Sequence, residues 1–186
     1  MSQRVAETHR SVARKAYQDK LTGLPNRRAF DEALAEHVAR AQADGSRFAL
    51  LFLDVDNLKQ VNDRIGHDAG DRALIRFALL AERSLDDSAG SAAWLARIGG
   101  DEFAVLFRGE PLPAQAQAHA EAFMTRVRAT TDSDQTALGA SIGIAVFPEH
   151  ATDASSLLRC ADHAMYRAKQ LGKNQIQLAQ TTPPAP

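Results

Sequence analysis

Apolar runs alternate with helical patterns along the chain, and glycine or proline separates many of them. The longest strictly apolar run, residues 48–53, predicts a central strand over 47–55 that is covered on both faces. Apolar residues at spacings of three and four predict helices over 27–43, 58–65, 71–85, 113–130 and 155–171. Shorter patterns predict strands over 92–98, 103–107, 136–147 and 174–178. This mixed order fits one sandwich of helices and strands.

The two ends of the chain have weaker patterns. Residues 1–18 predict a helix with few apolar positions, which favours a solvated arm. The end of a dimerising coiled coil is the alternative, because Val5 and Val12 are one heptad apart. The tail is rich in threonine and proline, and we expect it to be disordered.

Length and charge narrow the possible functions. A chain of 186 residues allows one domain and little else. Its 22 basic and 23 acidic residues give a net charge of -1, which argues against nucleic-acid binding and a polybasic membrane anchor. A single cysteine and the lack of a signal or membrane-spanning segment predict a cytoplasmic protein.

Two aspartates stand where the central strand is predicted to end. Asp54 and Asp56 are two residues apart, so an extended chain places both on one face. Carboxylates in this position can bind Mg²⁺, which prefers oxygen ligands. The alternative is a polar strand exit in which an aspartate caps the helix at 57–65, and spacing alone favours it.

Two further acids follow a Gly-Gly pair that has predicted strands on both sides. This pair predicts a hairpin with Asp101 and Glu102 at its tip. A solubilising tip is the ordinary interpretation. If the tip packs beside Asp54, the carboxylates converge and require cations to neutralise them, which implies a divalent-metal site. Lys59 lies one turn after the first pair of acids. Lys169 and Lys173, four residues apart on the last predicted helix, would normally form a solvated face, and they indicate function only beside a phosphate-bearing ligand.

Five motifs carry a resemblance to a known family. They are RIGGDEF at 97–103, DKLTGLPNRRAF at 19–30, LDVDNLKQVNDRIGHDAGD at 53–71, SIGIA at 141–145 and ADHAMYRAKQLGKN at 161–174. In this order they resemble the GGDEF family, the diguanylate cyclases. The resemblance implies an α+β fold, with a mainly antiparallel five-stranded sheet surrounded by helices, like the palm of nucleotidyl cyclases and polymerases. It implies a catalytic domain over 19–178 and a linker or signalling helix over 1–18, and the composition of the tail predicts disorder over 179–186.

The resemblance also implies a reaction. Members of this bacterial family condense two GTP into the second messenger cyclic di-GMP and release two pyrophosphates. Each subunit of a homodimer holds one GTP, and each 3′-hydroxyl attacks the α-phosphate held by the other subunit. The expected cofactor is Mg²⁺ or Mn²⁺, two ions per active site. An upstream sensory domain is the expected partner in the full-length protein.

Matching positions transfer the family's catalytic roles to this sequence. Asp54 and Asp101 are expected to bind the metal with the backbone carbonyl of Val55. Glu102 is expected to activate the 3′-hydroxyl or to bind the second metal ion. Asn62 and Asp71 are the expected guanine readers, although Asp71 after Gly70 would otherwise be interpreted as a helix N-cap.

The remaining matching positions are expected to contact phosphate or ribose. Phosphate contacts are expected from Lys59, Lys169, Lys173 and the backbone around Asn57 and Leu58. His67 is interpreted as structural or close to the ribose. Arg97 is expected to steady the hairpin or to bind phosphate, whereas the ordinary interpretation is an arginine on a surface strand.

The sequence departs from the family pattern at one regulatory motif. Many members carry an inhibitory product site, RxxD, and the four matching positions here are Gly90, Ser91, Ala92 and Ala93. We therefore expect no feedback inhibition through this site. A smaller departure is Leu58, where an aromatic residue is usual. A degenerate, non-catalytic GTP-binding module is the main alternative, and a cyclase that also accepts ATP is a third hypothesis.

Overall fold

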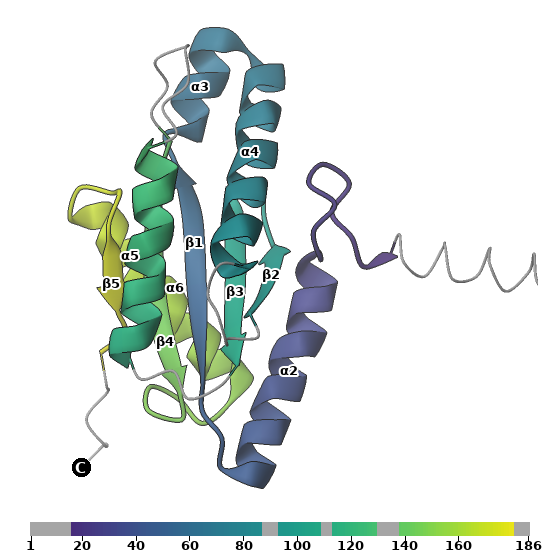
Figure 1. Cartoon of the computed structure of the whole chain (residues 1–186), viewed down its shortest axis with the longest axis vertical. Coiled ribbons are helices and arrows are strands. Elements are labelled where there is room, and N and C mark those ends of the chain that lie inside the picture. The colour runs from purple at the N-terminus through teal and green to yellow at the C-terminus, as the bar shows by residue number, and fades with distance from the viewer. Residues whose placement is uncertain (1–15, 87–92, 109–112, 130–137, 181–186) are drawn as a thin grey trace, which may run out of the picture.

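A five-stranded sheet with the strand order β2-β3-β1-β4-β5 forms the centre of the molecule (Figure 1). The computed structural model describes residues 16–86, 93–108, 113–129 and 138–180. The strands are β1 (Phe48–Asp56), β2 (Ala93–Arg97), β3 (Glu102–Arg108), β4 (Gly139–Phe147) and β5 (Ile176–Leu178). All neighbours are antiparallel except β4 and β5. The expected α+β fold with a mainly antiparallel sheet is confirmed.

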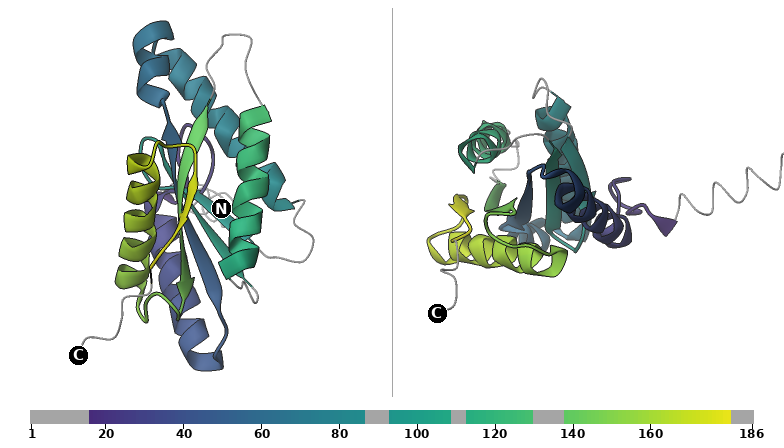
Figure 2. Two further views of the ribbon diagram at one scale, coloured as in Figure 1. Left: turned by 90° about the vertical axis from the view of Figure 1, so that its left-hand side faces the viewer. Right: turned by 90° about the horizontal axis from the view of Figure 1, so that it is seen from below.

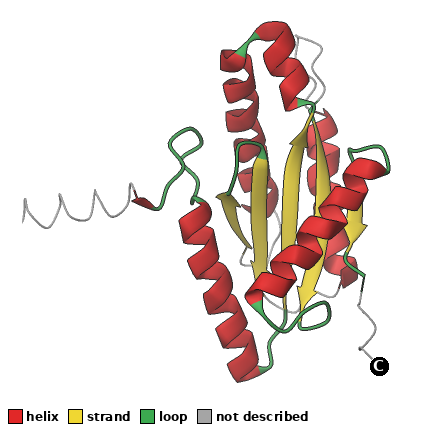
Figure 3. Ribbon diagram, turned by 180° about the vertical axis from the view of Figure 1, so that it is seen from behind, coloured by secondary structure: helices red, strands yellow, loops and turns green. Residues whose placement is uncertain are grey.

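Helices cover both faces of this sheet, as Figures 2 and 3 show. Their bounds are α2 (Arg27–Asp44), α3 (Leu58–Ile65), α4 (His67–Asp86), α5 (Pro113–Ala129) and α6 (Ala154–Gln170). The core cluster on one face includes buried residues of α4 and α5, and the cluster on the other face includes those of α2 and α6. The short helix α3 lies at the end of the sheet where β1 stops.

Strand β1 is buried along its whole length, as the apolar run predicts. Leu51 and Leu53 belong to the cluster with α4 and α5, whereas Leu50 and Phe52 belong to the cluster with α2 and α6. Because side chains alternate along a strand, Asp54 and Asp56 continue the row that faces α6. The predicted common face of the two aspartates is therefore confirmed.

Helix α6 packs closely over Gly143 of β4. A Cβ atom at this position would lie 2.0 Å from the carbonyl oxygen of Ala161 and 2.3 Å from the backbone nitrogen of Met165. Both neighbours are backbone atoms of α6 and cannot rotate away. The glycine therefore sets the distance between α6 and the sheet, and α6 carries one of the lysines assigned to the candidate site.

The long helix α4 begins four residues earlier than predicted. Gly66 ends α3 with a φ of 112°, and α4 starts at the next residue, His67. The sequence pattern placed a break at Gly70, but this glycine lies inside α4. A Cβ atom there would lie 1.9 Å from Oδ1 of Asn62, so a larger residue would have to displace this side chain. Asp71 consequently lies within the helix, and its interpretation as an N-cap is wrong.

Both predicted ends of the domain shift slightly. Gln18 forms a bridge with Pro25, and the carbonyl of Tyr17 accepts a hydrogen bond from the backbone of Asn26. The predicted helix therefore does not extend to residue 18, and residues 1–15 lie outside the described part of the chain. Ala179 is buried and donates its N–H to the carbonyl of Ile144. The predicted tail thus starts too early, and residues 181–186 are outside the description.

No helix in the described ranges is both long enough and apolar enough to cross a membrane.

Candidate active site

The strand β1 and the β2–β3 hairpin bring three of the predicted acidic residues to the same end of the sheet. Asp54 lies directly opposite Glu102 in the antiparallel register of β1 and β3. Side chains at paired positions point to the same face, so these two carboxylates are neighbours. The carbonyl of Asp101 accepts a 2.9 Å hydrogen bond from the backbone nitrogen of Val55. The hairpin is therefore tied to β1 at the residues that the sequence assigns to metal binding.

The carboxylate of Asp54 forms an ion pair with Lys169 of α6. The Nζ–Oδ2 distance is 2.6 Å, and only 9% of the Asp54 side chain is exposed. Burial raises the pKa of Asp54 to about 6, with further upward contributions from the charges of Asp101 and Asp56, although the Lys169 hydrogen bond lowers it. Burial lowers the pKa of Lys169, but its attraction to Asp54 outweighs this and raises the pKa overall. The site thus concentrates negative charge and holds a cationic group at its centre.

The raised pKa of Asp54 predicts a pH-dependent cost in stability. Its folded-state pKa of about 6 exceeds its ordinary value of 3.8, so the folded protein binds this proton more tightly than the unfolded chain. The cost is full above about pH 6 and disappears as the pH falls toward about 4. We expect Asp54→Asn to raise the free energy of unfolding by about 1–2 kcal/mol at pH 7.5.

Urea unfolding at two pH values tests this expectation. The gain from Asp54→Asn should be about 1 kcal/mol smaller at pH 5 than at pH 7.5. Asp63→Asn, at an exposed position of α3, is the control for removal of an aspartate charge. A gain from Asp54→Asn that stays constant between the two pH values would contradict the prediction.

The second aspartate of β1 has a different set of partners. Asp56 is 2% exposed and accepts hydrogen bonds from the Ser141 hydroxyl, at 3.0 Å to each oxygen, and from the backbone nitrogen of Asn174, at 2.8 Å. It does not cap α3, whose N-cap is Asn57 with a φ of 67° and no side-chain cap bond. The capping alternative for this aspartate is wrong, because a serine of β4 and the turn after α6 use its oxygens instead.

The donor set fits a hard divalent cation. Asp54, Asp101 and Glu102 supply carboxylate oxygens, which Mg²⁺ and Mn²⁺ prefer. The ammonium group of Lys169 already provides positive charge at Asp54. Within the described ranges, no three acidic, histidine or cysteine side chains are gathered closely enough to hold one metal ion. The carboxylates thus share one end of the sheet without forming a ready-made cage.

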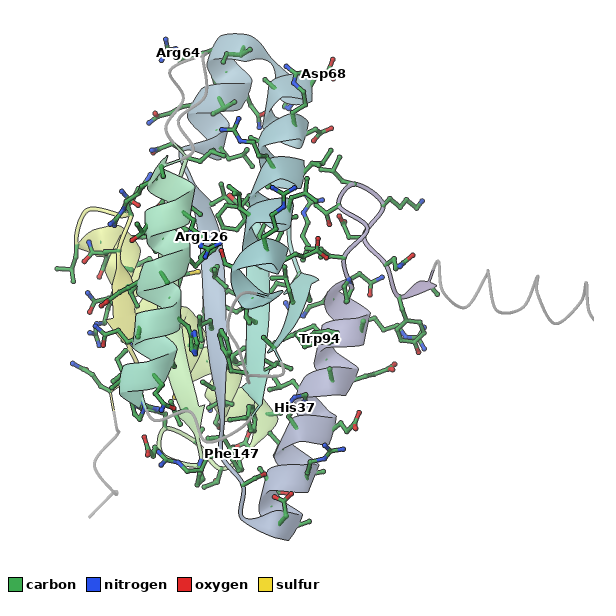
Figure 4. The ribbon with its side chains drawn as sticks, in the orientation of Figure 1. His37, Arg64, Asp68, Trp94, Arg126 and Phe147 are labelled. Carbon is green, nitrogen blue, oxygen red and sulfur yellow. The ribbon has the colours of Figure 1, made fainter. Side chains whose placement is uncertain are left out.

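The predicted guanine readers, Asn62 and Asp71, lie on α3 and α4. These helices meet beyond the end of β1 that carries the carboxylates (Figure 1). Asn62 of α3 packs against Gly70, the residue before Asp71. Oδ1 of Asn62 is buried and has no hydrogen-bond partner, whereas Asp71 is exposed. An unpartnered buried acceptor is costly unless a ligand satisfies it. Figure 4 shows Arg64 and Asp68 directed outward from the tip that α3 and α4 form beyond these residues.

Gly70→Ala should displace the Asn62 side chain. The added Cβ would overlap Oδ1 of Asn62. If Asn62 reads guanine, as the family resemblance implies, the Michaelis constant for GTP should rise at least about tenfold. Steady-state kinetics measure this change. In Gly70→Ala/Asn62→Ala the overlap is gone, so thermal stability should recover relative to Gly70→Ala while GTP recognition does not. An unchanged Michaelis constant in Gly70→Ala would contradict the prediction.

The remaining predicted contacts come from exposed positions near the ends of α3, α4 and α6. Lys59 is the second residue of α3, His67 is the first residue of α4, and Lys173 lies in the turn after α6. All three are exposed, whereas Leu58 is buried and keeps the packing role of the usual aromatic residue.

An arginine fixes the hairpin to the segment that precedes α2. Arg97 donates to Oδ1 of Asp19 at 2.9 Å and to the carbonyl of Gly100 at 2.7 Å. Burial raises the pKa of Asp19, but hydrogen bonds from Arg97 and Thr22 outweigh it and lower the pKa overall. The expectation that Arg97 steadies the hairpin is confirmed. Asp19 was missed by the sequence argument, although its spacing to Thr22 is a turn signal.

Comparison with known proteins now identifies the family. The family model described as "Diguanylate cyclase, GGDEF domain" matches residues 16–175, which is most of the chain. The chain belongs to the GGDEF domain family. Its carboxylate-bearing hairpin, tied to β1 and to Asp19, is therefore the GGDEF hairpin of this domain. GGDEF diguanylate cyclases generally use a divalent metal, in agreement with the oxygen-rich donor set.

Several relatives of this GGDEF domain are named enzymes of cyclic di-GMP metabolism. Diguanylate cyclase TpbB of Pseudomonas aeruginosa is 36% identical over 184 residues, covering 97% of this chain and 41% of TpbB. Cyclic di-GMP phosphodiesterase NbdA of the same species is 33% identical, covering 91% of this chain and 21% of NbdA. The domain thus spans about two fifths or less of these two proteins.

A solved structure supports the same assignment. The coiled coil and GGDEF domain of DgcB from Caulobacter crescentus, in complex with c-di-GMP, matches with a TM-score of 0.85 and 31% identity. The match covers 95% of this chain and 92% of that one. Most of the described fold is therefore shared with a GGDEF protein that binds c-di-GMP.

Proposed function

We propose that this chain is the catalytic GGDEF domain of a diguanylate cyclase that condenses two GTP into cyclic di-GMP and two pyrophosphates. The observation that carries the proposal is the pairing of Asp54 with Glu102 at the end of β1, beside the backbone contact to Asp101. The same residues match the family's catalytic motif, and the relative TpbB is named a diguanylate cyclase.

Asp54, Asp101, Glu102 and the Val55 carbonyl would hold the divalent metal, Mg²⁺ or Mn²⁺, two ions per site. When bound, the metal neutralises phosphate charge and lowers the pKa of the attacking hydroxyl. In this proposal Glu102 accepts the proton of the 3′-hydroxyl. Because Asp54 and Lys169 form an ion pair before substrate binds, α6 already places an ammonium group where phosphate oxygens are expected.

Substrate recognition is divided between two regions. Asn62 and Asp71 would read guanine, because a carboxylate accepts from N1–H and the 2-amino group, which adenine lacks at those places. Lys59, Lys169, Lys173 and the backbone at Asn57 and Leu58 would contact the phosphates, and His67 would lie near the ribose. Two subunits are needed, since each GTP supplies the attacking hydroxyl for the other. A sensory domain upstream would control how the subunits meet.

Product analysis tests the proposed function. The protein is incubated with Mg²⁺ and GTP or ATP, and the nucleotides are identified by mass. Cyclic di-GMP from GTP alone supports the proposal. Dinucleotides that contain adenine would indicate relaxed base choice, which the retained Asp71 argues against.

We also propose that the enzyme lacks product inhibition through the primary RxxD site. Of its four matching positions, Gly90, Ser91 and Ala92 lie outside the described residues, and Ala93 begins β2. None of the four side chains has an arginine fork or a carboxylate to bind guanine and phosphate. Titration with cyclic di-GMP should leave the initial rate unchanged at micromolar product. Tight inhibition that maps to residues 90–93 would contradict this.

A non-catalytic GTP-binding module is the second candidate. The relative NbdA, which is named a phosphodiesterase, matches most of this chain, so the fold alone does not imply cyclase activity. A dimeric, folded sample that binds GTP and makes no product would favour this candidate. The complete set of acidic residues and lysines favours catalysis.

A further inference from the structure

We propose that Asp56 is a positioning residue that locks the turn after α6 and so aims Lys173 at the substrate phosphates. This inference rests on the proposed function, because Lys173 is assigned to phosphate there. Asp56 is one of the most buried charged side chains of the described residues, at 2% exposure, yet none of the catalytic roles above uses it. Its partners indicate what it does.

The turn that carries Lys173 has an unfavourable backbone. Gly172, Lys173 and Asn174 have φ values of 115°, 64° and 48°, so two residues with side chains occupy the left-handed region in succession. Each such residue costs free energy and persists only where its surroundings enforce it. Backbone hydrogen bonds from Gly172 and Lys173 to the carbonyls of Lys169 and Ala168 secure the start of the turn, whereas the amide of Asn174 is held from the sheet.

Asp56 is the anchor from the sheet. Its Oδ2 accepts the backbone N–H of Asn174 at 2.8 Å. The Ser141 hydroxyl donates to both carboxylate oxygens and fixes the orientation of the group. A hydrogen bond to a buried carboxylate is stronger than one between neutral groups. The hydrogen bond to Asp56 therefore holds Asn174, the residue that directly follows Lys173.

Arg128 of α5 is a second anchor for Asn174. Arg128 donates to Oδ1 of Asn174 at 3.1 Å and to its carbonyl at 2.5 Å. Gly139 leaves room for this packing, since a Cβ atom there would lie 3.2 Å from the Asn174 side chain. Asn174 is thus held from β1 and α5 at once, while Lys173 beside it is exposed and directed by the locked backbone.

Two variants of Asp56 separate positioning from general stability. Asp56→Val removes the acceptor and suits a strand, so the affinity for GTP should fall about tenfold or more. Asp56→Asn keeps one acceptor oxygen for Asn174 and a donor for Ser141, so it should stay within about threefold of wild type. Guanosine, which has no phosphate, should bind both variants as it binds the wild type. An equal loss for guanosine and GTP would overturn the proposal.

Lys173→Ala tests whether the effect passes through the lysine. In this background, Asp56→Val should cause no further loss of GTP affinity. An undiminished second loss would mean that Asp56 acts elsewhere in the site, and it would overturn the inference.

Exposed Asn174 provides variants that do not disturb the core. Asn174→Ala and Asn174→Gly both lose the Oδ1 contact, but only alanine is strained at a φ of 48°. We expect alanine to weaken GTP binding at least about threefold more than glycine. Equal affinities for the two variants would contradict the role of the locked turn.

Hydrogen exchange of the Asn174 amide, without nucleotide, separates this inference from the proposed function. It should be faster by at least about tenfold in Asp56→Val than in the wild type. Unchanged exchange overturns the inference even if the protein makes cyclic di-GMP. Faster exchange in a protein whose wild type does not bind GTP supports the locked turn and overturns the proposed function.

Discussion

Glu102→Gln is expected to reduce cyclic di-GMP formation by about 10²- to 10⁴-fold while leaving the fold intact. The amide has the size of the carboxylate but cannot accept the proton of the 3′-hydroxyl at neutral pH. Glu102 is half-buried, and its carboxylate folds back toward Gly99, where an added Cβ would lie 2.4 Å from Oε2. The hairpin contact between Val55 and Asp101 uses backbone atoms, so it should survive the substitution.

The measurement is the initial rate of product formation at saturating GTP and Mg²⁺. Asp162→Asn, on the exposed side of α6, is the control for loss of a carboxylate outside the site. Circular dichroism of both variants should match the wild type. Retention of more than a tenth of the activity in Glu102→Gln would remove Glu102 from the proton-transfer role.

Gly143→Ala is expected to lower the free energy of unfolding by about 3 kcal/mol or more. The new methyl group would overlap two backbone atoms of α6, so the helix must move away from β4. Since α6 carries Lys169, the ion pair with Asp54 should also be disturbed. Cyclase activity is therefore expected to fall even at temperatures where the variant remains folded.

Urea unfolding followed by fluorescence measures the loss of stability. Gly100→Ala is the matched control, because a Cβ atom there meets nothing within 4 Å and its backbone needs no positive φ. Its free energy of unfolding should stay within about 0.5 kcal/mol of the wild type. A similar loss in the two variants would show that close packing at Gly143 is not the cause.

Local patterns in the sequence predicted most of the elements and the face on which Asp54 and Asp56 lie. They succeeded because period-two alternation in β1 and the Gly-Gly hairpin are encoded by neighbouring residues. The pairing of Asp54 with Glu102 required the register of two strands separated by about fifty residues. Residue spacing showed only that the carboxylates would converge if the hairpin packed beside Asp54. The family resemblance supplied the assignment of these residues to metal binding.

Features that depend on distant contacts were predicted poorly. Gly70 was interpreted as a helix boundary, although it serves the close approach of Asn62 from another helix. Asp56 was grouped with its neighbour as a metal ligand or helix cap, but Ser141 and Asn174 bind it across 85 and 118 residues of sequence. No local pattern carries this information. A buried acid that follows an apolar strand was the only signal available.

The attachment of residues 17–26 to β2 has a consequence for how the protein can be shortened. β2 is an edge strand, and the carbonyl of Pro25 accepts the backbone N–H of Arg97 on its open side. Exposed strand edges are templates for pairing with other chains. A fragment that begins at residue 26 or later would uncover this edge and release Arg97 from Asp19. We expect such a fragment to aggregate through β2 under conditions in which the central strands of the sheet are still folded.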